Sequence, residues 1–158
     1  MNAHKNIHFR RANQQDCQMY FTWANDLEVR KNSYKQEKIS FEQHKIWYEN
    51  QLNSSNSFLY VFLTENEEPV GQVRIEIKAK KAVIGISIDE NFRGKSLAST
   101  MLLQASSDFF NQHPNIPIHA YIKKENKASQ KSFHKAGFVT LHEVEIHGAQ
   151  SYELVKKH

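Results

Sequence analysis

Three residues that suit phosphate binding, Arg93, Gly94 and Lys95, stand between an apolar alternating run and a segment with helical periodicity. A turn in this position presents the free backbone N–H groups at the start of the helix, where the helix dipole is positive. Gly94 lacks a Cβ, so its backbone can approach an anion closely, and its two neighbours add positive charge. The turn is therefore predicted to bind the phosphate groups of a ligand.

Residues Gly94, Lys95 and Ser96 also match the last three positions of a P-loop, but the match stops there. A P-loop requires a glycine five residues before Gly94, and that position is Asp89. A carboxylate there would face the phosphates of a nucleotide. The turn is therefore not expected to belong to a nucleoside triphosphatase.

The length and composition of the chain predict one globular domain over residues 1–158. Hydrophobic residues make up 39% and charged residues 24% of the sequence, which allows a real core. A lone cysteine, Cys17, excludes an internal disulfide and fits a reducing cytoplasm. No signal peptide is visible at the N-terminus, and the longest apolar run, 58–63, is too short to span a membrane. The net charge of +4 is compatible with anionic ligands, but acidic residues are interspersed, so no nucleic-acid partner is expected.

The hydrophobic periodicity predicts a mixed α/β protein with the order β-α-α-β-β-β-α-β-α-β-β. The expected strands are 7–11, 58–65, 70–78, 82–88, 116–122, 138–146 and 151–155. The expected helices begin near Asn13, Ser40, Leu97 and Asn126. A glycine at position 137 is expected to end the last helix, because this position commonly needs a left-handed backbone.

The segment 86–98 resembles the acetyl-CoA site of the GNAT acetyltransferases, whose signature is Arg/Gln-x-x-Gly-x-Gly/Ala between a strand and a helix. Arg93 and Ala98 match its ends, while Ser96 stands where a glycine is usual. The order of elements along the whole chain is also that of a GNAT domain. This resemblance implies a central mixed, mostly antiparallel sheet of about seven strands flanked by four helices, with acetyl-CoA as co-substrate. The implied contact residues are Ile86, Ser87, Ile88, Arg93, Gly94, Lys95, Ser96, Leu97 and Ala98.

A second segment resembles the family pattern Asn-x-x-(Ser/Ala)-x-x-x-(Tyr/Phe)-x-x-x-Gly-Phe, and it adds Asn126, Ser129 and Phe133 to the implied acetyl-CoA site. In the family the asparagine lies near the pantetheine, although Asn126 could also serve only as a helix cap. Many GNAT enzymes have tyrosine at the place of Phe133, and its hydroxyl protonates the leaving thiolate. Phe133 cannot do so. Water or another residue must supply the proton, or the thiolate leaves unassisted, which a thiol pKa of about 8.5 permits.

The N-terminal third resembles the Trp-x-Asn-Asp-x-x-Val-Arg segment and the His…Trp helix of one GNAT branch. This branch contains ribosomal-protein and nucleotide-sugar acetyltransferases, and the closer likeness is to enzymes that acetylate a 4-amino sugar-nucleotide. A nucleotide diphosphate requires cationic contacts, and a tryptophan could stack on a base or sugar. The candidate substrate-binding residues are Arg30, His44, Trp47 and Arg74. Core packing is the favoured alternative for Trp23 and Trp47, and a solvated loop is the alternative for Arg30.

Acetyl transfer requires a neutral amine, donors for the developing oxyanion and a leaving thiolate. In the family the thioester carbonyl meets a backbone N–H on the signature strand, here near Ser87 and Ile88. Glu76 is the first candidate for the base, directly or through water, because strand alternation turns it away from the apolar side chains. Ser87 and His119 are weaker catalytic candidates. The alternative for Glu76 is an exposed edge charge.

The expected function is an N-acetyltransferase that acts on the primary amine of a nucleotide-linked amino sugar, as a monomer or a homodimer. Nine histidines are present, but only His4 and His8 have i, i+4 spacing, and no carboxylate or cysteine completes a cluster, so no metal is expected. Two alternatives remain open. One is a protein N-terminal acetyltransferase of the ribosomal type, and the other is a non-catalytic domain that binds acetyl-CoA or nucleic acid.

Overall fold

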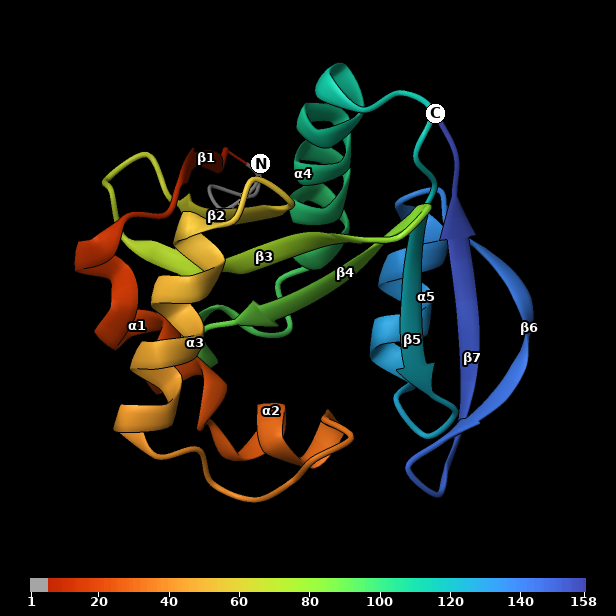
Figure 1. Ribbon diagram of the computed structural model, residues 1–158, viewed down its shortest axis with the longest axis horizontal. Helices are drawn as coiled ribbons and strands as arrows, with labels where there is room; N and C mark the ends of the chain where they lie inside the picture. Colours follow the sequence, from red (N-terminus) through yellow and green to blue (C-terminus); the bar gives the residue numbers. More distant parts are fainter. Residues whose placement is uncertain (1–5) are drawn as a thin grey trace.

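A computed structural model describes residues 6–158 as one seven-stranded sheet with helices on both faces (Figure 1). The strand order is β1-β2-β3-β4-β5-β7-β6. The β4–β5 pair is parallel and all other pairs are antiparallel, which confirms the predicted mixed, mostly antiparallel sheet. The strands are β1 (His8–Arg11), β2 (Ser57–Leu63), β3 (Pro69–Lys78), β4 (Lys81–Ile88), β5 (Ile118–Lys123), β6 (Val139–Ile146) and β7 (Ala149–Lys156).

The helices include the four that the sequence predicts and one more. They are α1 (Cys17–Ala24), α2 (Leu27–Asn32), α3 (Phe41–Asn53), α4 (Ala98–Gln112) and α5 (Lys127–Lys135), with short 3₁₀ turns η2 (Gln14–Asp16) and η3 (Glu90–Phe92). The additional helix, α2, has only six residues, too few to show a helical period. None of the helices in the described part of the chain is long and apolar enough to cross a membrane.

Side-chain caps fix where two of the predicted helices begin. Ser40 Oγ accepts a hydrogen bond from the Gln43 backbone N–H at the start of α3. Asn126 Oδ1 accepts one from the Ser129 N–H at the start of α5. These bonds satisfy N–H groups that have no partner within the helix. Gly137, with φ of 95°, follows the end of α5 in the left-handed region, as its position in the sequence predicts.

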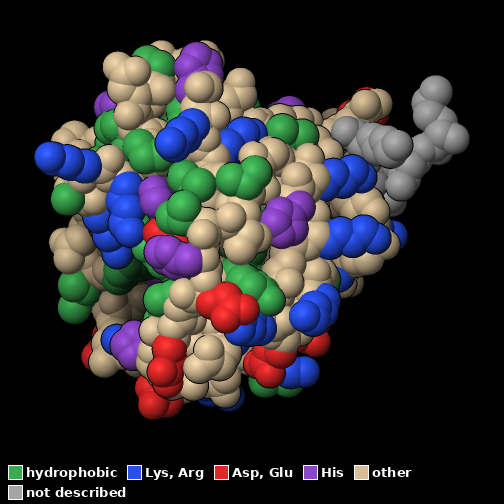
Figure 2. Space-filling view, turned by 90° about the vertical axis from the view of Figure 1, so that its right-hand side faces the viewer, with side chains coloured by type: hydrophobic (Ala, Val, Ile, Leu, Met, Phe, Trp, Pro, Cys, Tyr) green, Lys and Arg blue, Asp and Glu red, His purple; other side chains and the backbone are tan. Residues whose placement is uncertain are grey.

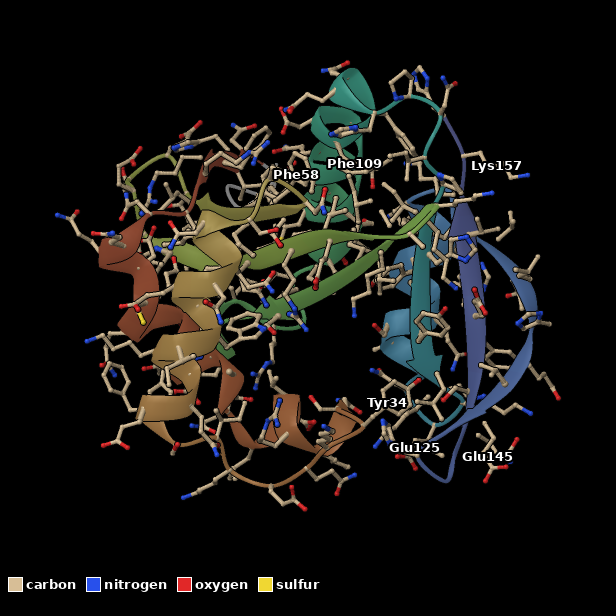
Figure 3. The ribbon with its side chains drawn as sticks, in the orientation of Figure 1. Tyr34, Phe58, Phe109, Glu125, Glu145 and Lys157 are labelled. Carbon is tan, nitrogen blue, oxygen red and sulfur yellow. The ribbon has the colours of Figure 1, made fainter. Side chains whose placement is uncertain are left out.

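The strand alternation separates the apolar core into two parts, one on each face of the sheet. On the face covered by α4 and α5, here called the α4 face, Phe58 packs edge-on against Phe109 with 5.2 Å between ring centroids (Figure 3). On the opposite face, here called the α3 face, Trp23 and Tyr48 from α1 and α3 pack on Leu59 and other apolar side chains of β2. Trp23 is therefore a core residue, as the alternative interpretation of the sequence held.

The central parallel pair of strands is very short. β4 and β5 pair only through Ala82 with Ile118 and Val83 with His119, and then diverge. The rest of β4, from Ile84 to Ile88, keeps β3 on one side and loses a strand neighbour on the other. This divergence opens the centre of the sheet toward the C-terminal ends of both strands.

The segment that contains α2 crosses from the N-terminal helices to the far half of the sheet. Lys123 Nζ on β5 donates to the Lys31 carbonyl at 3.1 Å, and Tyr34 Oη donates to Ser151 Oγ on β7 at 2.7 Å. Figure 3 shows Tyr34 beyond the end of α2, beside the turn that carries Glu125. The α2 segment therefore forms a bridge across the opening between β4 and β5.

The strand β6 forms the edge of the sheet opposite β1, and most of its residues are exposed. Two apolar side chains on it, Val139 and Leu141, are exposed by 60% and 51%. Figure 2 views this side of the molecule and shows hydrophobic, histidine and cationic side chains intermixed on its surface. The expectation that the protein is a monomer or a homodimer stays a prediction.

Candidate active site

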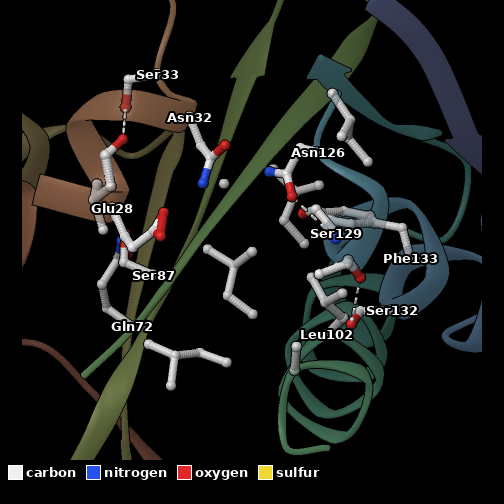
Figure 4. A pocket seen from close by; sticks show the side chains of 18 of the residues that line it. Glu28, Asn32, Ser33, Gln72, Ser87, Leu102, Asn126, Ser129, Ser132 and Phe133 are labelled. Atoms are coloured by element: carbon white, nitrogen blue, oxygen red, sulfur yellow. Dashed lines mark hydrogen bonds between the residues drawn. The ribbon is translucent and has the colours of Figure 1, made fainter. Parts of the chain in front are cut away.

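A single large cleft of about 1410 Å³ occupies the opening between β4 and β5 (Figure 4). Its walls come from β3 and β4 on one side and from β5, α5 and the start of α4 on the other, and residues of α2 also line it. All of the residues that the sequence assigns to acetyl-CoA or acceptor binding line this cleft. The sequence motifs, which lie far apart along the chain, therefore meet in one place.

The turn before α4 has the backbone geometry that an anion site requires. Gly94 has φ of 74°, and a Cβ built on it would have no atom within 4 Å, so the space above it is open. Ser96, which replaces a usual glycine, also lies in the left-handed region, with φ of 59°. No side chain caps the first turn of α4, so its N–H groups stay available to a ligand. These features fit the predicted phosphate site.

Arg93 has an ion-pair partner within the protein, which the sequence did not indicate. Its guanidinium pairs with the Asp26 carboxylate, and the same Asp26 oxygen accepts the N–H groups of Glu28 and Val29 at the start of α2. Asp89 accepts a hydrogen bond from the Trp23 indole at 2.9 Å. The phosphate turn is therefore fastened to α1 and α2 by two carboxylates.

Asn126 and Phe133 mark the α5 wall of the cleft. The Asn126 side chain caps α5 through its oxygen, while its Nδ2 forms no hydrogen bond among residues 6–158, so the cap leaves a donor for a ligand (Figure 4). Phe133 is 3% exposed and packs edge-on against Phe138 with centroids 5.0 Å apart. Its ring forms part of the wall and contributes no hydroxyl.

Arg30 lines the cleft, and most of its N–H groups have partners within the protein, while its role as a phosphate contact stays a prediction. Its Nε donates to the Ala24 carbonyl at 2.7 Å, and its two terminal nitrogens donate to the Lys35 and Glu37 carbonyls and to Ser33 Oγ. Four of its five N–H groups are therefore engaged by its own chain. Arg30 holds the loop between α2 and α3, and the motif alone could not reveal this because it does not show where the donors are satisfied.

His44, the second predicted substrate contact, lines the cleft but is largely enclosed by its own chain, and its contact with a substrate stays a prediction. It is 3% exposed, its Nε2 donates to the Cys17 carbonyl at 3.0 Å, and its ring stacks on Tyr48. Burial lowers the pKa of His44, so the ring stays neutral near pH 7. Trp47, by contrast, is 37% exposed and borders the cleft, so it remains a candidate for stacking on an acceptor.

The remaining Trp-x-Asn-Asp residues also serve the scaffold. Asn25 Nδ2 donates to the Ile39 carbonyl and its Oδ1 accepts from the Ile39 N–H, both at 2.8 Å. Together with the bonds of Asp26 and Arg30, this pair closes the loop around α2. The motif that resembles an acceptor-binding segment thus builds the bridge over the cleft.

A row of polar side chains on β3 forms the floor of the cleft. Gln72, Arg74 and Glu76 share the α3 face and lie opposite Ser87, Gly85 and Val83 of β4. The Arg74 guanidinium lies directly over Gly85, where a Cβ would come within 2.8 Å of Cζ. The Arg74 side chain is exposed to the cleft, desolvation by the surrounding protein lowers its pKa, and no atom in the described chain forms a hydrogen bond or an ion pair with it.

Sequence reasoning missed Gln72 and Gly85, although both left a signal. Gln72 shares the strand alternation that identified Arg74 and Glu76. A glycine inside a strand, as at position 85, commonly marks a close approach of another group. Their partners could not be inferred, because the register between β3 and β4 is a long-range property.

His119 is a structural residue. Its Nδ1 lies 2.6 Å from Glu153 Oε2, beside His142 and Lys81, which contact the same carboxylate. These contacts lower the pKa of Glu153 despite its burial. Within residues 6–158 no group of three or more His, Cys, Asp or Glu side chains is arranged to hold a metal. His4 lies outside the described residues.

The left-handed backbone at Ser96 predicts an unusual order of stabilities. Ser96→Gly should be more stable than Ser96→Ala by about 1 kcal/mol, because only glycine adopts this conformation without a Cβ penalty. The two variants both remove the hydroxyl, so urea unfolding of the pair isolates the backbone effect. An alanine variant as stable as the glycine variant would contradict the assignment of strain to this turn.

The structural role of Arg30 predicts a loss of stability. Arg30→Met keeps the aliphatic stem but removes four hydrogen bonds, so the free energy of unfolding should fall by roughly 2 kcal/mol. Lys31→Met is the control, because no side-chain hydrogen bond of Lys31 is present in the described chain. Equal stabilities of the two variants in urea unfolding would show that Arg30 does not hold this loop.

Comparison with known proteins identifies the family to which this chain belongs. The profile of the Acetyltransferase (GNAT) domain matches residues 6–139. A spermidine N-acetyltransferase from Vibrio cholerae, solved with CoA and spermine, has a TM-score of 0.85 at 16% identity, covering 96% of this chain and 95% of that chain. The aminoglycoside acetyltransferase AAC(6')-Ib, solved with coenzyme A, has a TM-score of 0.78 at 16% identity, with 96% and 95% covered.

A sequence search of curated proteins gave no significant match, so the branch within the family is not identified by sequence. The profile nevertheless covers most of the chain, and the fold and the cleft agree with it. The chain therefore belongs to the GNAT acetyltransferases and is an acetyl-CoA-dependent N-acetyltransferase.

Proposed function

We propose that this enzyme acetylates the amine of a small, anionic acceptor of the nucleotide-linked amino sugar class. Acetyl-CoA would lie along β4 between Ile86 and the turn 93–98, and its thioester supplies the acetyl group. The acceptor would enter beneath the α2 bridge and lie on the floor formed by β3. The observation that carries this proposal is the free guanidinium of Arg74 at that end of the cleft.

The charge of the cleft favours anionic substrates at both ends. Ten Lys and Arg side chains line it, against three Glu side chains. Some of these cations, such as Lys95 and Lys127, lie near the phosphate turn and α5, where they suit the phosphates of CoA. Lys78 and Arg74 on β3 and Lys123 on β5 line the rest of the cleft, where a polyamine or an aminoglycoside would meet like charges.

Arg74 meets the requirements of an anchor for the anionic group. A charged guanidinium without a partner in a partly enclosed site gains strongly from a phosphate or carboxylate. Its neighbour on the same face, Gln72, lies two residues along the strand, or about 7 Å away. An amine near Gln72 and an anion at Arg74 would therefore belong to one small molecule. A 4-amino sugar with a diphosphate on its anomeric carbon fits this spacing.

The proposed base is Glu76, acting through water. It shares the floor with Arg74 and is half-buried, but it lies four residues from Gln72, or roughly 13 Å along the strand. Direct proton abstraction from an amine beside Ser87 is therefore disfavoured. Because Phe133 carries no hydroxyl, the proton on the leaving thiol would also come through water.

The α2 bridge favours a small acceptor over a protein N-terminus. The Lys123–Lys31 and Tyr34–Ser151 hydrogen bonds join the two sides of the cleft above the floor. A folded protein substrate would have to pass its terminus under this bridge. Trp47, at the rim, offers a surface on which a nucleobase can stack.

Replacing Arg74 should affect the acceptor and leave acetyl-CoA nearly unaffected. Arg74→Met should lower kcat/KM for a UDP-linked 4-amino sugar by roughly 10- to 150-fold, the loss of one charge-assisted contact. Arg74→Lys should recover part of this loss. A free-thiol release assay measures both variants against the wild type, with spermidine and an N-terminal peptide as comparison acceptors. Turnover of spermidine or the peptide, without turnover of any nucleotide-linked amino sugar, would reject this acceptor class.

The phosphate turn can be tested by a matched pair of variants. Gly94→Asp and Gly94→Asn have similar shapes, and both side chains tolerate the left-handed backbone at this position. Because a Cβ there meets no atom within 4 Å, both variants should fold. Only the aspartate repels phosphates, so it should bind CoA at least about tenfold more weakly than the asparagine variant in calorimetry. Equal affinities would place the phosphates elsewhere.

A further inference from the structure

Gln72 and Ser87 form a polar pair in the wall of the cleft. They lie opposite each other on β3 and β4, and they are only 4% and 7% exposed (Figure 4). Gln72 Nε2 donates to Ser87 Oγ at 3.0 Å. This is the sole hydrogen bond of either side chain within the described residues.

This hydrogen bond fixes the role of the serine hydroxyl. A hydroxyl has one hydrogen to donate and two lone pairs that accept. Because Gln72 occupies a lone pair, the hydrogen of Ser87 is left over, and no acceptor for it exists in residues 6–158. Ser87 borders the cleft, so the unused hydrogen is available to a bound ligand.

The pair also leaves a buried acceptor unsatisfied. Gln72 Oε1 is buried and has no partner in the described chain, which is unfavourable because a buried acceptor loses its hydrogen bonds to water. Turning the amide by half a rotation would let Oε1 accept from Ser87, but it would leave Nε2 without a partner instead. The observed orientation is the one that keeps the serine hydrogen free. Unsatisfied buried groups of this kind call for a functional explanation.

We propose that Gln72 is a positioning residue that holds Ser87 as a hydrogen-bond donor to the thioester carbonyl oxygen of acetyl-CoA. This inference rests on the placement of acetyl-CoA along β4 proposed above. In the transfer, the amine nitrogen bonds to the acyl carbon, the carbon–sulfur bond breaks, and the amine proton ends on the sulfur through water. Negative charge grows on the carbonyl oxygen during this step, so a donor fixed in advance lowers the barrier.

One substitution can reverse the direction of the hydrogen bond between residues 72 and 87. In Gln72→Glu, an ionised carboxylate only accepts, so it should draw the Ser87 hydrogen away from the cleft. With a UDP-linked 4-amino sugar as acceptor, kcat should fall by about tenfold, and Ser87→Ala should lower it by 10- to 100-fold, on the order of one lost oxyanion donor. Gln72→Met removes the bond without reversing it, so its loss should be smaller than that of Gln72→Glu.

A double variant separates this effect from the added charge. In the Ser87→Ala background, Gln72→Glu should cause little further loss of kcat, because the hydroxyl it acts through is gone. An equal loss in both backgrounds would overturn the proposal, since charge or misfolding would then explain it. Thermal unfolding checks that each variant is folded.

An acceptor-free measurement keeps this inference separate from the proposed substrate class. Because CoA lacks the thioester carbonyl, Ser87→Ala should weaken acetyl-CoA binding by about threefold in calorimetry and leave CoA binding unchanged. Failure of the wild type to bind acetyl-CoA would reject the proposed function itself. Normal binding of acetyl-CoA with unchanged affinity and kcat in Ser87→Ala would reject only the role of the Gln72–Ser87 pair.

Discussion

The divergence of β4 and β5 is the feature on which the rest of the molecule depends. The two strands pair at Ala82 and Val83 only, and the backbone beyond faces an opening where a neighbouring strand would otherwise lie. Backbone donors and acceptors along this part of β4 that do not pair with β3 are therefore available to an extended ligand. The turn before α4, the start of α5 and the α2 segment all line that space. The cleft thus takes the place that a neighbouring strand would have beside β4.

The fold alone does not determine which acceptor an enzyme uses, so a few side chains in the cleft must do so. Structures with the same fold include enzymes named for spermidine and for aminoglycosides, and they share less than a quarter of their residues with this chain. Here the floor residues Gln72, Arg74 and Glu76 and the cleft-lining Lys123 set the charge of the region in which we propose that the acceptor lies. Such positions change without disturbing the apolar layers on either face, because strand alternation separates them from the core. Function in this family therefore has to be argued from the floor of the cleft.

The sequence predicted the strands and four helices because these depend on local alternation, periodicity and caps. It missed α2, since six residues show no period and the cap at Asp26 was assigned to a ligand-binding motif. It did not reveal the internal hydrogen bonds of Arg30 and His44, because residue type suggests chemistry but does not show whether backbone carbonyls already occupy the donors. The position of Arg74 over Gly85, and the pairing of Gln72 with Ser87, follow from strand register, which local patterns do not encode.

The shared carboxylate of Asp26 has a thermodynamic consequence. Its Oδ1 caps α2 and also pairs with Arg93, so one group belongs both to the α2 bridge and to the phosphate turn. A phosphate that attracts Arg93 competes with this pair and changes the electrostatics at the N-terminus of the bridging helix. Phosphate binding at the turn would then be coupled to the stability of the α2 bridge. Such a coupling would be reciprocal. If acetyl-CoA stabilised the α2 bridge and the acceptor bound beneath that bridge, the acceptor would strengthen acetyl-CoA binding by the same free energy.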